Sequence, residues 1–166
     1  MPNFDINSFM ANYSNGARQY LFYILLDNPM GSLGMDRTSY LVRSSSIPEW
    51  TIEPITTNWQ GNEYKQGSTH TFGDWTVEFN VDARSKVHDD FEAWQSLIHD
   101  PTSNMHGDPL SYMRNQTIQL LDGFGDKIKE RTLIAAWPST VGEIALDYGT
   151  KDVANFSVTF SYQYYV

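Results

Sequence analysis

Two segments in which apolar and polar side chains alternate strictly are the feature that most constrains the fold of this chain. Residues 74–82 carry a large apolar side chain at every second position, with polar side chains between them. Residues 154–166 repeat the pattern, beginning with Phe156, Val158 and Phe160. Because successive side chains of a strand point to opposite faces, both segments are predicted to be strands with one buried face.

Between these strands the period changes. Apolar residues in the segment 83–98 recur at i, i+4, i+7 and i+11, which predicts one buried stripe of an amphipathic helix. Asp82 is the expected N-cap, and the Asp100-Pro101 step is the expected stop. The stripe consists of Val87, Phe91, Trp94 and Ile98.

Other segments complete the predicted architecture. A short helix or turn is expected over 6–16, a connection over 28–37, a loop over 99–113, and further strands over 19–27, 38–48 and 139–149, besides a hairpin over 114–138. The sum is a mainly β fold, a two-sheet antiparallel β-sandwich or barrel with one flanking α-helix, in a single domain spanning 1–166. The predicted core contains Trp75, Val77, Phe79, Phe91, Trp94, Trp137, Phe156, Val158 and Phe160.

The segment 49–69 is a long excursion with patches of alternation and no clean period. It is expected to form an extended arm or loop, such as a β-hairpin. Segments of this length in a compact domain are usually functional. Trp50 and Trp59 are too large to be left in water without reason, so both are candidate contacts with a partner.

The hairpin 114–138 has an unusual outer face. Its first strand presents amide and hydroxyl side chains where an ordinary exposed strand carries Lys and Glu. Alternation predicts that Ile118, Leu120, Leu133, Ala135 and Trp137 point into the core, with Arg131 on the same side and in need of an exit. The outward set is Asn115, Thr117, Gln119, Glu130 and Thr132.

Charge and composition exclude several classes of function. The net charge is −9, and residues 61–110 hold nine acidic against three basic side chains. Such a chain cannot neutralise phosphates, so tight nucleic-acid binding by counterion release is not expected. The absence of cysteine removes disulfides and thiolate metal sites, and no apolar run approaches the roughly 20 residues of a membrane helix.

Catalytic signatures are absent from the sequence. There is no G-x-S-x-G elbow, and no glycine-rich phosphate loop follows a predicted strand. His99 and His106 fall beside Asp, Pro and Gly on a predicted loop, where solvated turn formers are far commoner than metal ligands. His88 lies on the polar face of the predicted helix, where a solvated role is expected. No catalytic, metal or cofactor site is therefore predicted, and the chain is not expected to be an enzyme.

From about Thr71 to Val166 the chain resembles the tail tube proteins of contractile-tailed bacteriophages. The resemblance is looser over 18–48, and the segments 28–37 and 49–69 depart from the family pattern. The residues that carry it are Phe72, Asp74 and Trp75, then Phe91 with Trp94, Trp137-Pro138, Val141-Gly142-Glu143 and Leu146-Asp147.

The resemblance implies a structural virion protein with a fold similar to the haemolysin-coregulated protein of type VI secretion. Copies would close into hexameric rings, and rings would stack into the inner tube of the tail, assembled in the host cytoplasm. Implied partners are the chain itself, the sheath protein, and baseplate and tube-terminator proteins, with DNA passing through unbound. In that setting the outward hairpin face would line the bore, and Trp50 and Trp59 would contact a neighbouring copy.

Two alternatives stay open at this point. A tube-initiating or baseplate paralogue would share the same fold. A carbohydrate-binding β-sandwich would use Trp and Tyr platforms, although Trp75 and Trp94 lie on apolar stripes and are better explained as core. Self-assembly into rings or tubes separates the tube subunit from the carbohydrate-binding module.

Overall fold

The computed structural model describes residues 5–30 and 35–166. None of the helices within these ranges is long and apolar enough to cross a membrane. The elements in chain order are α1 (Ile6–Tyr13), β1 (Phe22–Leu25), α2 (Met35–Tyr40), β2 (Val42–Ser45), β3 (Trp50–Trp59), β4 (Asn62–Phe72), β5 (Trp75–Asn80), α3 (Lys86–Ile98), α4 (Pro109–Tyr112), β6 (Arg114–Leu121), β7 (Lys127–Val141), β8 (Asn155–Ser161) and β9 (Tyr164–Tyr165).

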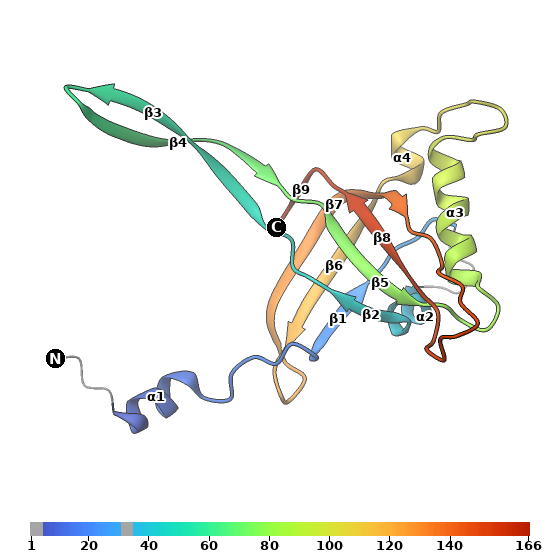
Figure 1. The fold of residues 1–166 in the computed structure, drawn as a ribbon, viewed down its shortest axis with the longest axis horizontal. Coiled ribbons are helices and arrows are strands. Elements are labelled where there is room, and N and C mark those ends of the chain that lie inside the picture. The colour runs from blue at the N-terminus through green and yellow to red at the C-terminus, as the bar shows by residue number, and fades with distance from the viewer. Residues whose placement is uncertain (1–4, 31–34) are drawn as a thin grey trace.

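The strands form a mainly β, antiparallel fold, as the alternation predicts. The hydrogen-bonded order is β1-β6-β7-β8-β5-β2, with β9 also paired to β7. The long strand β7 belongs to two sheets, because its first part pairs with β6 and β9 and its last part pairs with β8. Strands β3 and β4 form a separate two-stranded ribbon that projects away from the body (Figure 1).

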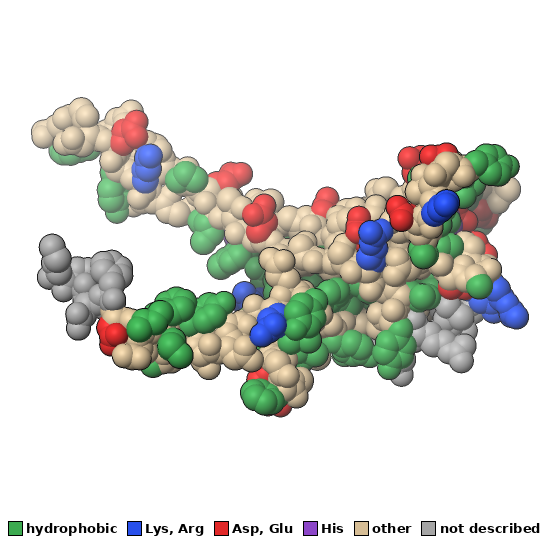
Figure 2. Space-filling model, turned by 60° about the horizontal axis from the view of Figure 1, so that its bottom comes forward, with side chains coloured by type: hydrophobic (Ala, Val, Ile, Leu, Met, Phe, Trp, Pro, Cys, Tyr) green, Lys and Arg blue, Asp and Glu red, His purple; other side chains and the backbone are tan. Residues whose placement is uncertain are grey.

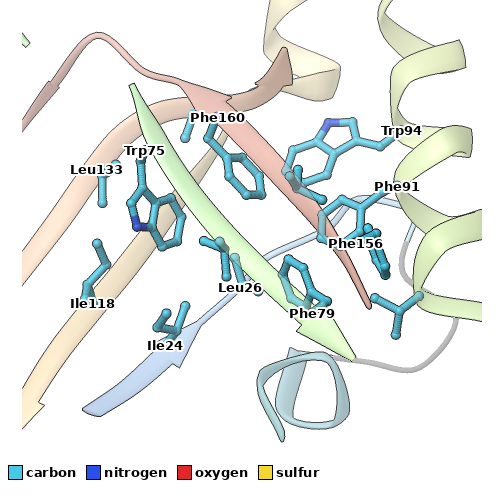
Figure 3. Close-up of a cluster of buried hydrophobic side chains, with 14 residues drawn as sticks. Ile24, Leu26, Trp75, Phe79, Phe91, Trp94, Ile118, Leu133, Phe156 and Phe160 are labelled. Atoms are coloured by element: carbon cyan, nitrogen blue, oxygen red, sulfur yellow. The ribbon is translucent and has the colours of Figure 1, made fainter. Parts of the chain in front are cut away.

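The core fills the space between the curved sheets and α3, which covers one side of the body (Figures 1 and 3). Phe91 and Trp94 point from α3 into this core, where the Phe91 ring centroid lies 5.1 Å from that of Phe79. Trp75 and Phe160, opposite each other on β5 and β8, are also 5.1 Å apart. Eight of the nine predicted core side chains are buried here: Trp75, Val77, Phe79, Phe91, Trp94, Phe156, Val158 and Phe160.

The amphipathic helix begins later than its sequence predicts. Its N-cap is Ser85, whose side chain makes no capping hydrogen bond. Asp82 still caps the first turn from outside, because its Oδ1 accepts the Val87 backbone N–H at 3.3 Å. The expectation that Asp82 is the N-cap residue is wrong by position, whereas the capping chemistry is retained.

Three predicted strands are shorter than their sequence pattern, and of the segment 19–27 only Phe22–Leu25 is a strand. The segment 38–48 begins inside α2, and only Val42–Ser45 is a strand, because the short run Thr-Ser-Tyr at 38–40 continues the helix that packs against β1. The segment 139–149 forms no strand of its own, since β7 runs through Pro138 to Val141 and the chain then leaves the sheet. The predicted connection 28–37 lies partly outside the described residues.

One buried polar residue joins β6 to the end of β1. Gln116 is fully buried, although its sequence neighbours suggest a solvated amide. Its Nε2 donates to the Asp27 backbone oxygen and its Oε1 accepts from the Asp27 N–H, both at 2.8 Å. The side chain thus takes the place of a strand partner for the backbone at Asp27.

Replacing Gln116 with leucine is expected to lower the free energy of unfolding by about 1–3 kcal/mol, because the Asp27 backbone groups lose their partners. Chemical denaturation measures the loss. Gln119→Leu, on the outer face of the same strand, is the matched control and should cost clearly less. Equal losses would contradict the role given to Gln116.

Candidate functional surfaces

The register of the β6–β7 hairpin brings four outward side chains together. Thr117 lies directly opposite Thr132, and Gln119 lies opposite Glu130. The two threonine Oγ1 atoms are 3.5 Å apart, and Gln119 Nε2 donates to Glu130 Oε2 at 2.7 Å. The buried side chains Ile118 and Leu133 occupy the opposite face of these strands. The four residues therefore form one continuous polar surface, here called the hairpin face.

Glu130 supplies the charge on the hairpin face. Its Oε2 also lies 2.9 Å from Lys127 Nζ, at the end of β7 next to the turn. The hydrogen bonds from Lys127 and then from Gln119 hold the pKa of Glu130 below its ordinary value. One basic side chain, Lys127, therefore lies beside the hairpin face, and it is paired with a carboxylate.

Asn115 has a different role from the other four candidates. Its Oδ1 accepts the Ala135 backbone N–H at 3.1 Å, and the register shifts between Arg114 and Gln116. Ala135 has a φ of 54°, a left-handed conformation that is unusual for a residue with a Cβ. Asn115 therefore stabilises a β-bulge through its side chain.

The bulge reverses the orientation of the following side chains of β7 as far as Pro138, beyond which the register shifts a second time. Ala136 and Pro138 are buried, while Ala135 and Trp137 are only partly buried. The expectation that Ala135 and Trp137 point into the core is wrong, because one extra residue shifts the alternation by one position. The Trp137 ring instead contacts Tyr112 of α4, with centroids 6.4 Å apart.

Arg131 was expected on the core side of its strand, and a neighbouring aromatic ring provides the route by which its charge leaves the core. Arg131 pairs with Ile118 across the strands and so begins on the core side. Its guanidinium carbon lies 5.4 Å from the centre of the Tyr165 ring, over which the side chain leaves the core. A cation is attracted electrostatically to the face of an aromatic ring, and this attraction offsets part of the cost of removing the charge from water.

The excursion at 49–69 is a β-hairpin, here called the arm and consisting of Trp50–Phe72. Strands β3 and β4 are exposed along almost their whole length. Gln60 and Gly61, both at positive φ, form its tip. Trp50 and Trp59 lie at the two ends of β3 and are 55% and 70% exposed. Both tryptophans are thus accessible to a partner.

Aromatic rings anchor the base of the arm to the body. The Phe72 ring lies 6.3 Å from Trp50, which stacks on it, and 5.1 Å from Tyr165. Tyr162 Oη donates to the Gly73 backbone oxygen at 2.7 Å. Burial of this phenol, with the nearby Tyr165, raises the pKa of Tyr162 to about 12.

Three histidines considered in the sequence analysis make contacts that hold segments of the fold together. His99 and His106 are joined by an isolated β-bridge. His88, Asp89 and Glu92 could bring three ligand atoms within 4.8 Å of one another on α3. The expectation of a solvated His88 is wrong, however, because its ring packs 4.9 Å from that of Phe156. Its Nε2 is 3.3 Å from the Gly142 oxygen, which links α3 to the segment after β7.

Comparison with known proteins identifies the family of this chain. A family model described as phage tail tube protein matches residues 3–166, and the chain belongs to that family. It is 25% identical over 154 residues to a tail tube protein of Serratia phage KSP90, covering 89% of this chain and 87% of that protein. It is 24% identical over 152 residues to the tail tube protein gp19 of Enterobacteria phage T4, covering 90% of each.

Solved structures share the fold. A chain of the anti-feeding prophage baseplate superposes with a TM-score of 0.68 at 18% identity, covering 92% of this chain and 95% of that one. A chain from the sheath–tube complex of an extracellular contractile injection system gives a TM-score of 0.63 at 14% identity, covering 98% and 97%. At these identities the likeness establishes the architecture of the body.

Proposed function

We propose that this protein is the structural subunit of the inner tube of a contractile phage tail and has no enzymatic activity. Copies close into hexameric rings, and the rings stack into a tube within a sheath, between a baseplate and a terminator. The observation that carries the proposal is the family match over residues 3–166. Rings and stacks both need head-to-tail contacts, for which the exposed arm offers a surface.

The hairpin face is the proposed lining of the bore. A channel for DNA has to stay hydrated without holding phosphates. Each cation that neutralised a phosphate would add a gain from counterion release, and a long tube would repeat that gain many times. The hairpin face presents neutral groups and one carboxylate to its surroundings. The neutral groups belong to Thr117, Thr132 and Gln119, and the carboxylate is that of Glu130. Lys127, next to the turn, is neutralised by Glu130.

The arm is the proposed contact with a neighbouring copy. Trp50 and Trp59 are large aromatic side chains that the subunit leaves exposed, and such side chains are typical interface anchors. The aromatic contacts at the base of the arm join it to the body, and the remainder of the arm is left exposed for a partner. A virion location follows from this role.

Electron microscopy of the purified protein in negative stain tests the proposal. Long tubes of stacked rings are the expected result. Isolated rings that never elongate would favour a tube-initiating or baseplate paralogue. A chain that stays monomeric at every concentration and binds glycans would overturn the tube and support a carbohydrate-binding module.

The double substitution Thr117→Lys and Gln119→Lys is expected to leave tube assembly intact and to slow DNA delivery, most clearly at low salt. The lysine introduced at position 119 would lie opposite Glu130, so the unpaired charge at position 117 should dominate the effect. Release of DNA from virions, timed at two salt concentrations, measures it. Thr117→Gln is the neutral control of similar length. Delivery unchanged at low salt would place this face away from the bore.

A further inference from the structure

The helix α1 presents an apolar stripe that nothing in the described part of its own chain covers. Ile6, Phe9, Met10 and Tyr13 stand at i, i+3, i+4 and i+7, which places them on one face of the helix. All four are between 58% and 64% exposed, and α1 contains no buried residue. Phe9 and Tyr13 stack on each other with ring centroids 5.2 Å apart, so the stripe is ordered within the helix.

The arm presents a second uncovered apolar surface. Figure 2 shows hydrophobic side chains gathered along one edge of the arm and along the side of the N-terminal segment that faces it, on either side of an open space. Both segments project from the same end of the body (Figures 1 and 2). The large apolar side chains of the arm that are at least half exposed are Trp50, Ile52, Ile55, Trp59 and Tyr64.

Neither segment can stabilise itself. Isolated helices shorter than about 12 residues are marginal in water, and α1 has 8. A lone two-stranded hairpin is likewise marginal without a surface on which to pack. The arm is exposed over nearly all of β3 and β4. Each segment therefore gains stability only when its apolar face is covered.

We propose that the apolar stripe of α1 in one copy docks on the apolar edge of the arm of an adjacent copy. This inference rests on the proposed function, which places many copies in head-to-tail contact. Every copy carries one stripe and one edge, so in a tube the pairing covers both surfaces throughout. Segments 6–13 and 50–72 then behave as the two halves of one repeating interface.

The chemistry of the two surfaces fits an apolar contact. The helix Ile6–Tyr13 contains no charged residue. Within the arm, Glu63 and Lys65 lie 3.8 Å apart, which leaves Glu53 as the remaining acidic side chain of the two strands. Because burial of apolar surface supplies the attraction, the contact should hold at high salt, unlike an interface made from exposed ion pairs.

Site-directed crosslinking tests the contact, since the natural chain has no cysteine. Met10→Cys carrying one affinity tag and Ile55→Cys carrying another are mixed before assembly. A short bismaleimide is then added to the tubes. Each copy has a single thiol, so a covalent dimer containing both tags can form only between copies. We expect this two-tag dimer to be the main product in low and high salt.

Ser8→Cys is the matched control, because Ser8 lies on the opposite side of α1 from the stripe and is exposed. Paired with Ile55→Cys, it should give at least fivefold less two-tag dimer. Ile6→Cys and Tyr64→Cys form a second test pair in case either first substitution prevents assembly. For each test pair, the control is Ser8→Cys combined with the same arm variant. If tubes form and neither test pair gives more two-tag dimer than its control, the inference is overturned and the proposed function is unaffected. Failure of the unsubstituted chain to form tubes would instead count against the proposed function.

Discussion

Replacing both Trp50 and Trp59 with serine should abolish tube assembly and leave a folded subunit. Buried aromatic anchors commonly supply about 2 kcal/mol or more each to an interface. At tenfold in the dissociation constant for every 1.4 kcal/mol, the loss of two such anchors weakens each contact roughly a thousandfold. The arm packs little against the body beyond its base, so the core keeps its own stability. Negative-stain microscopy and sedimentation measure assembly, and circular dichroism measures folding.

Single substitutions separate the two roles of these residues. Trp50 also stacks on Phe72, so Trp50→Ser should loosen the base of the arm as well as the interface. Trp59 is at the far end of β3 and is 70% exposed, so Trp59→Ser reports on the partner contact alone. Asn58→Ser, one residue away, is the control and should assemble normally. Normal tubes from the double variant would show that the arm is not an assembly contact.

Replacing Trp94 with alanine is expected to lower the free energy of unfolding by about 3–5 kcal/mol, the range for removing a large aromatic side chain from a core. Trp94 is fully buried, and its ring contacts those of Phe91 and Phe160. Its Nε1 also donates to the Tyr112 backbone oxygen at 2.8 Å, which would lose that partner. A loss of this size threatens the folding of the subunit. Urea denaturation measures it.

Two companion variants test the cause of that loss. Trp94→Phe keeps most of the ring contacts but removes the hydrogen bond, so its cost should fall clearly below that of alanine. Ser96→Ala, on the exposed side of the same helix, should change stability by less than about 0.5 kcal/mol. If Ser96→Ala destabilised the protein as much as Trp94→Ala, the assigned orientation of α3 would be wrong.

Local sequence pattern was sufficient to predict the buried face of a segment when one periodicity runs through the whole segment and its large apolar side chains lie on one side. The alternation in β5 and β8 and the stripe of α3 predicted buried faces that the structure contains. In the hairpin, Thr117 and Gln119 lie opposite Thr132 and Glu130, on the side of the sheet away from the buried Ile118 and Leu133. The exposure of Trp50 and Trp59 was also predictable, because no periodic pattern around them offered a core.

Sequence pattern failed where distant contacts decide the conformation. Alternation in β7 reverses at Ala135, because Asn115 on the neighbouring strand holds a bulge that no short window reveals. The short run at 38–40 joins a helix, because packing against β1 overrides its strand propensity.

The amino-acid sequence alone thus determined the mainly β class, the buried faces of its regular elements, the polar outer face of one hairpin and an arm with two accessible tryptophans. Tertiary structure decided the bulge that turns Trp137 out of the core, the burial of Gln116 and the direction of the arm. Gln116 finds its partners at Asp27, 89 positions away in the chain. The physical reason is range: side-chain periodicity is a property of neighbouring residues, whereas a backbone group that lacks a strand partner is satisfied only after distant segments meet.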